Sequence, residues 1–143
     1  MTGEPWKHAA RWSARWLSAI LVLGSAAALA QAYRFEVPEA EVTVAVGADG
    51  SARVRYGIRF VCQPGAHPID VVDIGMPNLG RHEALGARLD GQPLPASALR
   101  VSTFLKPRGC GYEVDLGSSA IQPGQAGLFE FAGREYGMVW QDT

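Results

Sequence analysis

The sequence contains little of what most site chemistries require. Among its 143 residues there are only two cysteines and three histidines, and none falls at the spacing of a structural zinc site. The 13 basic and 14 acidic residues give a net charge of −1, and no long run of one charge occurs. A protein that binds nucleic acid usually needs a basic face, so this balance argues against that class.

Sequence motifs for nucleotide binding and for serine hydrolysis are missing as well. No glycine-rich phosphate loop follows an expected strand and opens a helix. Ser118 and Ser119 lie in a glycine-flanked loop, but they lack the G-x-S-x-G pattern of a hydrolase nucleophile. The chain has no low-complexity tract or internal repeat, and its 48% hydrophobic residues are enough for a folded core.

One long uncharged run is present, over residues 16–33. Basic residues precede it, its apolar part begins at Leu17, and it thins into alanines. The A-x-A spacing that signal peptidase recognises occurs twice, at Ala28, Ala30 and Ala32. A basic front, a short apolar middle and small residues at the end are the three parts of a secretory signal peptide, so we expect one in residues 1–32.

An uncleaved signal anchor is the alternative, because the run has about the length at which a helix can span a membrane. Serine, glutamine and repeated alanine make its second half weakly apolar, and this favours cleavage. Both alternatives keep the basic front in the cytoplasm and export residues 33–143. We therefore expect a periplasmic, extracellular or membrane-anchored domain, which contacts the membrane only through an uncleaved N-terminal segment.

From Tyr33 onward, apolar and polar residues alternate with the period of half-buried strands. The stretches "EVTVAV" and "RVRYGIRFVC" both place their even-numbered residues inward. Because the facing residues of the two strands must both be even-numbered, the turn between them must contain an odd number of residues. A three-residue turn over residues 48–50 satisfies this parity rule, with Gly50 in the left-handed conformation. The predicted inward pairs are Val46 with Ala52, Val44 with Val54 and Val42 with Tyr56, and the predicted outward pairs are Glu39 with Arg59 and Thr43 with Arg55.

Shorter stretches of strand character follow, and no helical pattern occurs after residue 33. They are residues 69–76, a strand that ends at Leu89, residues 99–105, "GYEVDLG", "LFEFAG" and "GMVWQDT". Turn sequences such as "DGQP" separate them. About seven or eight short strands at this spacing predict an antiparallel, immunoglobulin-like β-sandwich for residues 33–143.

Three stretches, "AHPIDVVDIGMP", "LDGQPL" and "VDLGSSAIQPGQAGLFEF", resemble the N-terminal exported module of uncharacterised bacterial membrane and secreted proteins. The resemblance covers most of residues 33–143. It implies a sandwich-like domain that follows a leader and often precedes a membrane helix. This chain has no second apolar segment, so the resemblance implies a truncated version or a fragment. It brings no catalytic residues with it.

The two cysteines both fall in the part expected to be exported. Cys62 ends an inward-facing row, and Cys110 lies between two glycines. Two cysteines in an exported domain most simply form one disulfide, so we expect a Cys62–Cys110 bond. On the chain-entropy model, closing this loop would stabilise the fold by about 4 kcal/mol. Two free buried thiols or a metal pair are the alternatives.

Candidate catalytic or ligand-binding side chains are few. His67, Asp70 and Asp73 lie together in "HPIDVVD", but residues 70 and 73 of a strand point to opposite faces and do not make a carboxylate pair. Asp73 could be a calcium ligand or a catalytic acid, yet a charge in an apolar strand needs a partner, and we favour a structural role. A polyanion could bind the row Arg53, Arg55 and Arg59, although a solvated, partly ion-paired face is favoured.

These observations predict a non-catalytic extracytoplasmic module that serves envelope structure or interaction with a partner, either a protein or another envelope component. A carbohydrate- or calcium-binding module is the alternative, with Tyr112, Tyr136 and Trp140 as the available aromatics. A hydrolase that uses His67 or one of the two aspartates is the third candidate. The sequence assigns no catalytic residue, no cofactor and no metal ligand.

Overall fold

The computed structural model describes residues 32–77, 81–105 and 110–138. The predicted signal segment, with Ala28 and Ala30, lies outside the described residues, as does most of the last predicted strand, with Trp140. In the described part of the chain, no helix has the length and apolar character needed to cross a membrane.

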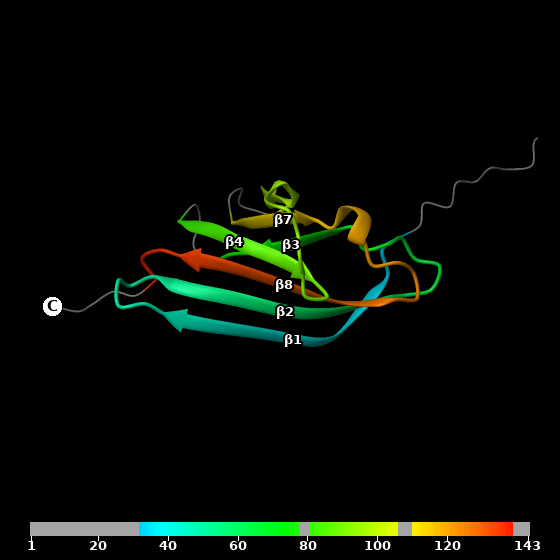
Figure 1. The fold of residues 1–143 in the computed structure, drawn as a ribbon, viewed down its shortest axis with the longest axis horizontal. Coiled ribbons are helices and arrows are strands. Elements are labelled where there is room, and N and C mark those ends of the chain that lie inside the picture. The colour runs from blue at the N-terminus through cyan, green and yellow to red at the C-terminus, as the bar shows by residue number, and fades with distance from the viewer. Residues whose placement is uncertain (1–31, 78–80, 106–109, 139–143) are drawn as a thin grey trace, which may run out of the picture. The chain divides into compact units, whose positions relative to one another are not determined.

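The described chain forms two antiparallel sheets (Figure 1). The larger sheet has the strand order β1-β2-β8-β4-β5, and the smaller has the order β3-β7-β6. The strands are β1 Phe35–Val46, β2 Ala52–Cys62, β3 Val71–Gly75, β4 His82–Leu89, β5 Gln92–Pro93, β6 Leu99–Val101, β7 Gly111–Asp115 and β8 Ala126–Glu135. Two short 3-10 helices, η1 Ala96–Ala98 and η2 Gly117–Ser119, lie in the connections.

The predicted all-β, antiparallel sandwich is confirmed. The strand order differs from that of an immunoglobulin domain, in which the last strand and the third strand belong to the same sheet. Here β8, the last described strand, lies in the middle of the larger sheet, between β2 and β4. It pairs with β2 along its whole length, from Ala52 opposite Glu135 to Val61 opposite Ala126.

The first hairpin has the predicted register. Val42, Val44 and Val46 lie opposite Tyr56, Val54 and Ala52, as the parity of the turn requires. Gly50 has a φ of 75°, the left-handed conformation that glycine adopts without strain. On the outer face Glu39 lies opposite Arg59, and their side chains form an ion pair at 3.4 Å. A bulge between Glu36 and Glu39 interrupts the pairing near the start of β1.

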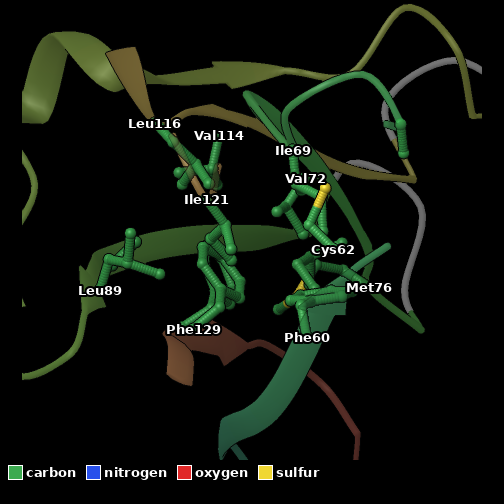
Figure 2. Close-up of a cluster of buried hydrophobic side chains, with 14 residues drawn as sticks. Phe60, Cys62, Ile69, Val72, Met76, Leu89, Val114, Leu116, Ile121 and Phe129 are labelled. Atoms are coloured by element: carbon green, nitrogen blue, oxygen red, sulfur yellow. The ribbon is translucent and has the colours of Figure 1, made fainter. Parts of the chain in front are cut away.

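The hydrophobic core lies between the two sheets (Figure 2). Phe129 and Phe131 of β8 are almost completely buried at its centre, which is the position that the alternation of "LFEF" predicts. The core cluster is Phe60, Cys62, Ala66, Ile69, Val72, Ile74, Met76, Ala87, Leu89, Val114, Leu116, Ile121, Phe129 and Phe131.

Close backbone contact holds the smaller sheet together where β3 meets β7. Gly111 lies directly opposite Gly75. A Cβ atom on Gly111 would overlap the carbonyl oxygen of Ile74, which is backbone and cannot rotate away. Glycine is therefore required at position 111 for this approach.

The predicted Cys62–Cys110 disulfide is absent, and both cysteines are free thiols. The backbone of Cys62 bonds to Gln125, just before β8 begins. Cys110 accepts a hydrogen bond from the N–H of Met76, whose side chain reaches Gly133 near the other end of β8. Most of β8 therefore lies between the positions that the two cysteines approach, a length of about 20 Å at about 3.3 Å per residue.

A disulfide needs Cα atoms within about 7 Å, so this separation excludes the bond. The alternation of a strand gives the face on which a cysteine lies and says nothing about its position along the sandwich. The Cys62 thiol instead donates a hydrogen bond to the carbonyl oxygen of His67, at 3.3 Å.

Candidate binding groove

A groove of about 510 Å³ is open to solvent between the start of β1 and strand β3. Its lining is largely apolar and consists of Tyr33, Phe35, Phe60, Ile69, Val71, Val72, Asp73 and Phe104. Three of these aromatics are well exposed, and Phe104, at 78%, is the most exposed large hydrophobic residue in the described part of the chain. Apolar side chains exposed singly are ordinary, but a contiguous group of them marks a site for a ligand or a partner.

Specific contacts hold the aromatic side chains at the start of β1. The Tyr33 hydroxyl donates a hydrogen bond of 2.6 Å to Asp70, and its ring packs on His67 with centroids 4.7 Å apart. Phe35 packs edge-on against Phe60 at 5.6 Å. The hydrogen bond to Asp70 raises the pKa of Tyr33 above its usual value, because it favours the protonated phenol. This end of the groove is therefore built from fixed rings.

Ser102 positions the opposite wall of the groove. The residue is 1% exposed. Its hydroxyl donates a hydrogen bond to the carboxylate of Asp73 and accepts hydrogen bonds from the N–H groups of Phe104 and Leu105, at 3.2 Å each. One donor and two acceptor sites are the full capacity of a serine hydroxyl. The hydroxyl thus folds the loop after β6 so that Phe104 lines the groove. The partner that Asp73 needs in its apolar strand is this serine.

The three acidic and imidazole candidates do not meet in one cleft. Asp70 accepts a hydrogen bond from the Tyr33 hydroxyl, and His67 packs against the ring of the same tyrosine. Asp73 is bonded to Ser102 instead. The Nδ1 of His67 lies 2.7 Å from the carbonyl oxygen of Pro68, so this nitrogen carries the proton and donates it. Each group thus has a structural contact. The other nucleophile candidates, Ser118 and Ser119, lie in the exposed helix η2 and do not line the groove.

The predicted carbohydrate-site aromatics are not the ones that the structure exposes together. Tyr112 packs inward, with its ring 5.8 Å from that of Phe131 and 5.1 Å from that of His82. Tyr136 lies beyond the end of β8, and Trp140 lies outside the described residues. Sequence reasoning missed the groove's own aromatics. The alternation of Tyr33 and Phe35 was a signal for the first two, but the loop residue Phe104 gave none.

The arginine row lies on the outer face of the larger sheet among acidic side chains. Arg59 pairs with Glu39, and Arg53 lies opposite Arg134, which forms an ion pair of 3.3 Å with Glu83. Mixed charges of this kind are typical of a solvated sheet face. The face is thus partly ion-paired, as the sequence favoured.

A buried polar cluster at one end of the core also escaped the sequence reasoning. Glu135 is fully buried on the inner face and lies opposite His82. The Tyr112 hydroxyl lies 3.2 Å from Nδ1 of His82. Burial raises the pKa of Tyr112 and of Tyr56, and the charge of Glu135 adds to both shifts. The sequence did carry a signal for the burial of Glu135, because this residue continues the inward-facing alternation of Phe129, Phe131 and Gly133.

Over residues 32–77, 81–105 and 110–138, no three His, Cys, Asp or Glu side chains gather as a metal site would require. A scan against models of protein families finds no match, and a search of curated protein sequences finds none either. The function of the groove therefore has to be argued from its geometry.

Proposed function

We propose that residues 33–143 form a non-catalytic extracytoplasmic module that binds a partner protein or another envelope component through the groove between β1 and β3. The observation that supports this most is the set of exposed aromatics, Tyr33, Phe35 and Phe104, which line one apolar groove. Rigid aromatic anchors contribute much of the free energy of protein binding. Here they are held ready by hydrogen bonds and ring packing in the absence of a partner.

The proposal of a non-catalytic role rests on what the polar groups at the groove do. The carboxylate of Asp70 is bonded to Tyr33, and that of Asp73 is bonded to Ser102. A general acid or base needs to reach a substrate proton within about 3 Å, together with a second reacting group. Both carboxylates instead form hydrogen bonds that hold the walls of the groove in place. The extracytoplasmic location rests on the leader sequence.

Site-directed photo-crosslinking in the cells from which the protein comes tests the proposal. A benzophenone amino acid replaces Phe104 in one variant and Leu85 in the other. Leu85 is also an exposed apolar residue, but it lines a different hollow, of about 490 Å³, over β4 and β8. We expect a discrete covalent adduct from position 104 only, and its loss when Phe35→Ser is added. Equal adducts at both positions, or none at 104, would contradict the proposal.

A further inference from the structure

We propose that the occupant of the groove is an extended peptide segment of the partner, which adds to the free edge of β3 as a fourth strand of the smaller sheet. This inference rests on the proposed function and specifies its binding mode. It further assigns the chemistry of the segment: apolar residues at alternate positions, and a lysine or arginine on the face that meets Asp73.

The free edge of β3 supports the addition of a fourth strand. Within residues 32–77, 81–105 and 110–138, the strand lies at the edge of the smaller sheet and pairs with β7 alone. The carbonyl of Asp70 and the N–H of Met76, one at each end of β3, bond towards β7 at 2.7 Å each. Because antiparallel strands alternate their bonding direction, the even-numbered residues bond to β7 and the odd-numbered ones point to the free edge.

The backbone groups of Val71 and Asp73 therefore face the groove side. In the described turns and loops, no backbone hydrogen bond goes to either residue. The carbonyl of Gly75, the next odd-numbered residue, already accepts a hydrogen bond of 3.1 Å from the Tyr56 hydroxyl. Unpaired N–H and C=O groups along an edge are a template for another strand. Tyr56 marks one end of this template.

The apolar inner face of β1, which no other described residue covers, also supports strand addition. Every residue of β1 is exposed, including Val42, Val44 and Val46 on the inner face. Their neighbours on the same face of β2 are less exposed: Val54 and Ala52 are buried, and Tyr56 is half-buried and bonds to Gly75 of β3. Farther along the same face, Phe60 belongs to the core between the sheets. The smaller sheet thus covers β2 and stops short of β1.

The position of β3 places the missing strand above β1. The hydrogen bond from Tyr56 to Gly75 sets β3 over β2, while β6, at the other edge of the smaller sheet, lies close to β4. The next strand beyond β3 would therefore lie over β1. Its inward side chains would cover the inner face of β1 as far as Val42, the residue opposite Tyr56, which explains why the partner segment should be apolar at alternate positions.

Charge distinguishes between two possible occupants of the groove, a peptide from another protein and a second copy of this chain. Asp73 is the one charged side chain among the described lining residues, with Asp70 nearby at Tyr33. A cationic residue of the partner would face it favourably. Two copies of β3 paired edge to edge would bring these aspartates towards each other, which is unfavourable. The edge of β1 is a poor alternative, because Pro38 and the bulge between Glu36 and Glu39 disrupt it.

Synthetic peptides added to the full chain, as the cell processes it, test the inference. The parent probe is a capped heptapeptide with valine at the second, fourth and sixth positions, lysine at the third and threonine elsewhere. We expect it to bind with a dissociation constant well below about 1 mM and, near saturation, to slow amide hydrogen exchange at Val71 and Asp73 by about tenfold or more. Replacing its valines with serine should abolish binding, and glutamate for lysine should weaken it by about tenfold.

Backbone methylation tests the mode of binding directly. Two further probes carry N-methyl groups on alternate amides, one set for each edge of the strand. Only the edge that faces β3 is used, so one set should lose about tenfold or more in affinity and the other should bind like the parent. On the protein, Val42→Thr should weaken binding several-fold, while Ala45→Thr, on the outer face of the same strand, should leave it unchanged.

The outcomes distinguish the two proposals. If Phe104→Ala weakens peptide binding but both methylated probes bind like the parent, the groove binds and strand addition is wrong. If the crosslink at position 104 forms and no probe binds at about 1 mM, strand addition by such a segment is likewise overturned. Protection of the Val71 amide that rises with protein concentration alone would identify a second copy as the occupant and overturn the inference.

Discussion

Strands β1 and β8 pair with opposite edges of the same strand, β2, and both alternate apolar with other residues. Along β8 the alternate residues are buried, whereas every residue of β1 is exposed. The difference lies in what is above them, because the smaller sheet covers β8 and does not reach β1. Alternation in a sequence therefore predicts the face on which a side chain lies, and another layer decides whether that face is buried.

The largest expected effect compares a buried and an uncovered apolar side chain. Phe129→Ala removes a ring from the centre of the core and should lower the free energy of unfolding by about 3–5 kcal/mol. Val44→Ala removes exposed methyl groups from β1 and should change it by less than about 0.5 kcal/mol. Urea unfolding of both variants measures the difference. Similar losses would mean that β1 is covered in solution.

The next effect contrasts two strand glycines. Gly111→Ala places a methyl group against the backbone of β3 and should destabilise the protein by about 1–3 kcal/mol. Gly57→Ala in β2 meets no atom within 4 Å and should be close to neutral. Thermal unfolding of the pair checks this. A neutral Gly111→Ala would show that β3 and β7 can separate at this point without cost.

The third comparison concerns the hydroxyl that holds the groove loop. Ser102→Ala removes a buried donor from Asp73 and an acceptor from two backbone N–H groups, so a loss of about 1–3 kcal/mol is expected. The exposed residue Ser119, changed to alanine, is the matched control and should stay within about 0.5 kcal/mol. Chemical unfolding of both variants provides the measurement. Equal stabilities would show that Ser102 does not organise the loop.

The smallest effect is a titration at the start of β1. The bond to Asp70 raises the pKa of Tyr33, so neutral Tyr33 is favoured in the folded state. The stability that this bond contributes is present below the ordinary tyrosine pKa of 10.0 and is lost as the pH rises through the folded value. Asp70→Asn should lower the Tyr33 pKa, measured by NMR of its labelled ring. An unchanged pKa would mean that the bond is not formed in solution.

The sequence predicted the parts of the fold that depend on local pattern. Parity and one glycine were enough for the register of the first hairpin, and alternation identified Phe129 and Phe131 as core residues. The pairing of distant strands left no such mark, so the sequence did not reveal that β8 lies between β2 and β4. The disulfide prediction failed for the same reason. The groove depends on where the smaller sheet ends and on a loop that Ser102 holds, and neither is a local property.

The central position of β8 has a consequence for how the chain acquires its fold. Ala52 pairs with Glu135, so the larger sheet joins segments that are far apart in the sequence. The β1–β2 hairpin can form early from local contacts, but β8 can join it only after residues 126–135 have been synthesised. Folding rates fall as such long-range contacts increase. During that interval both edges of the hairpin are open to pairing with other strands.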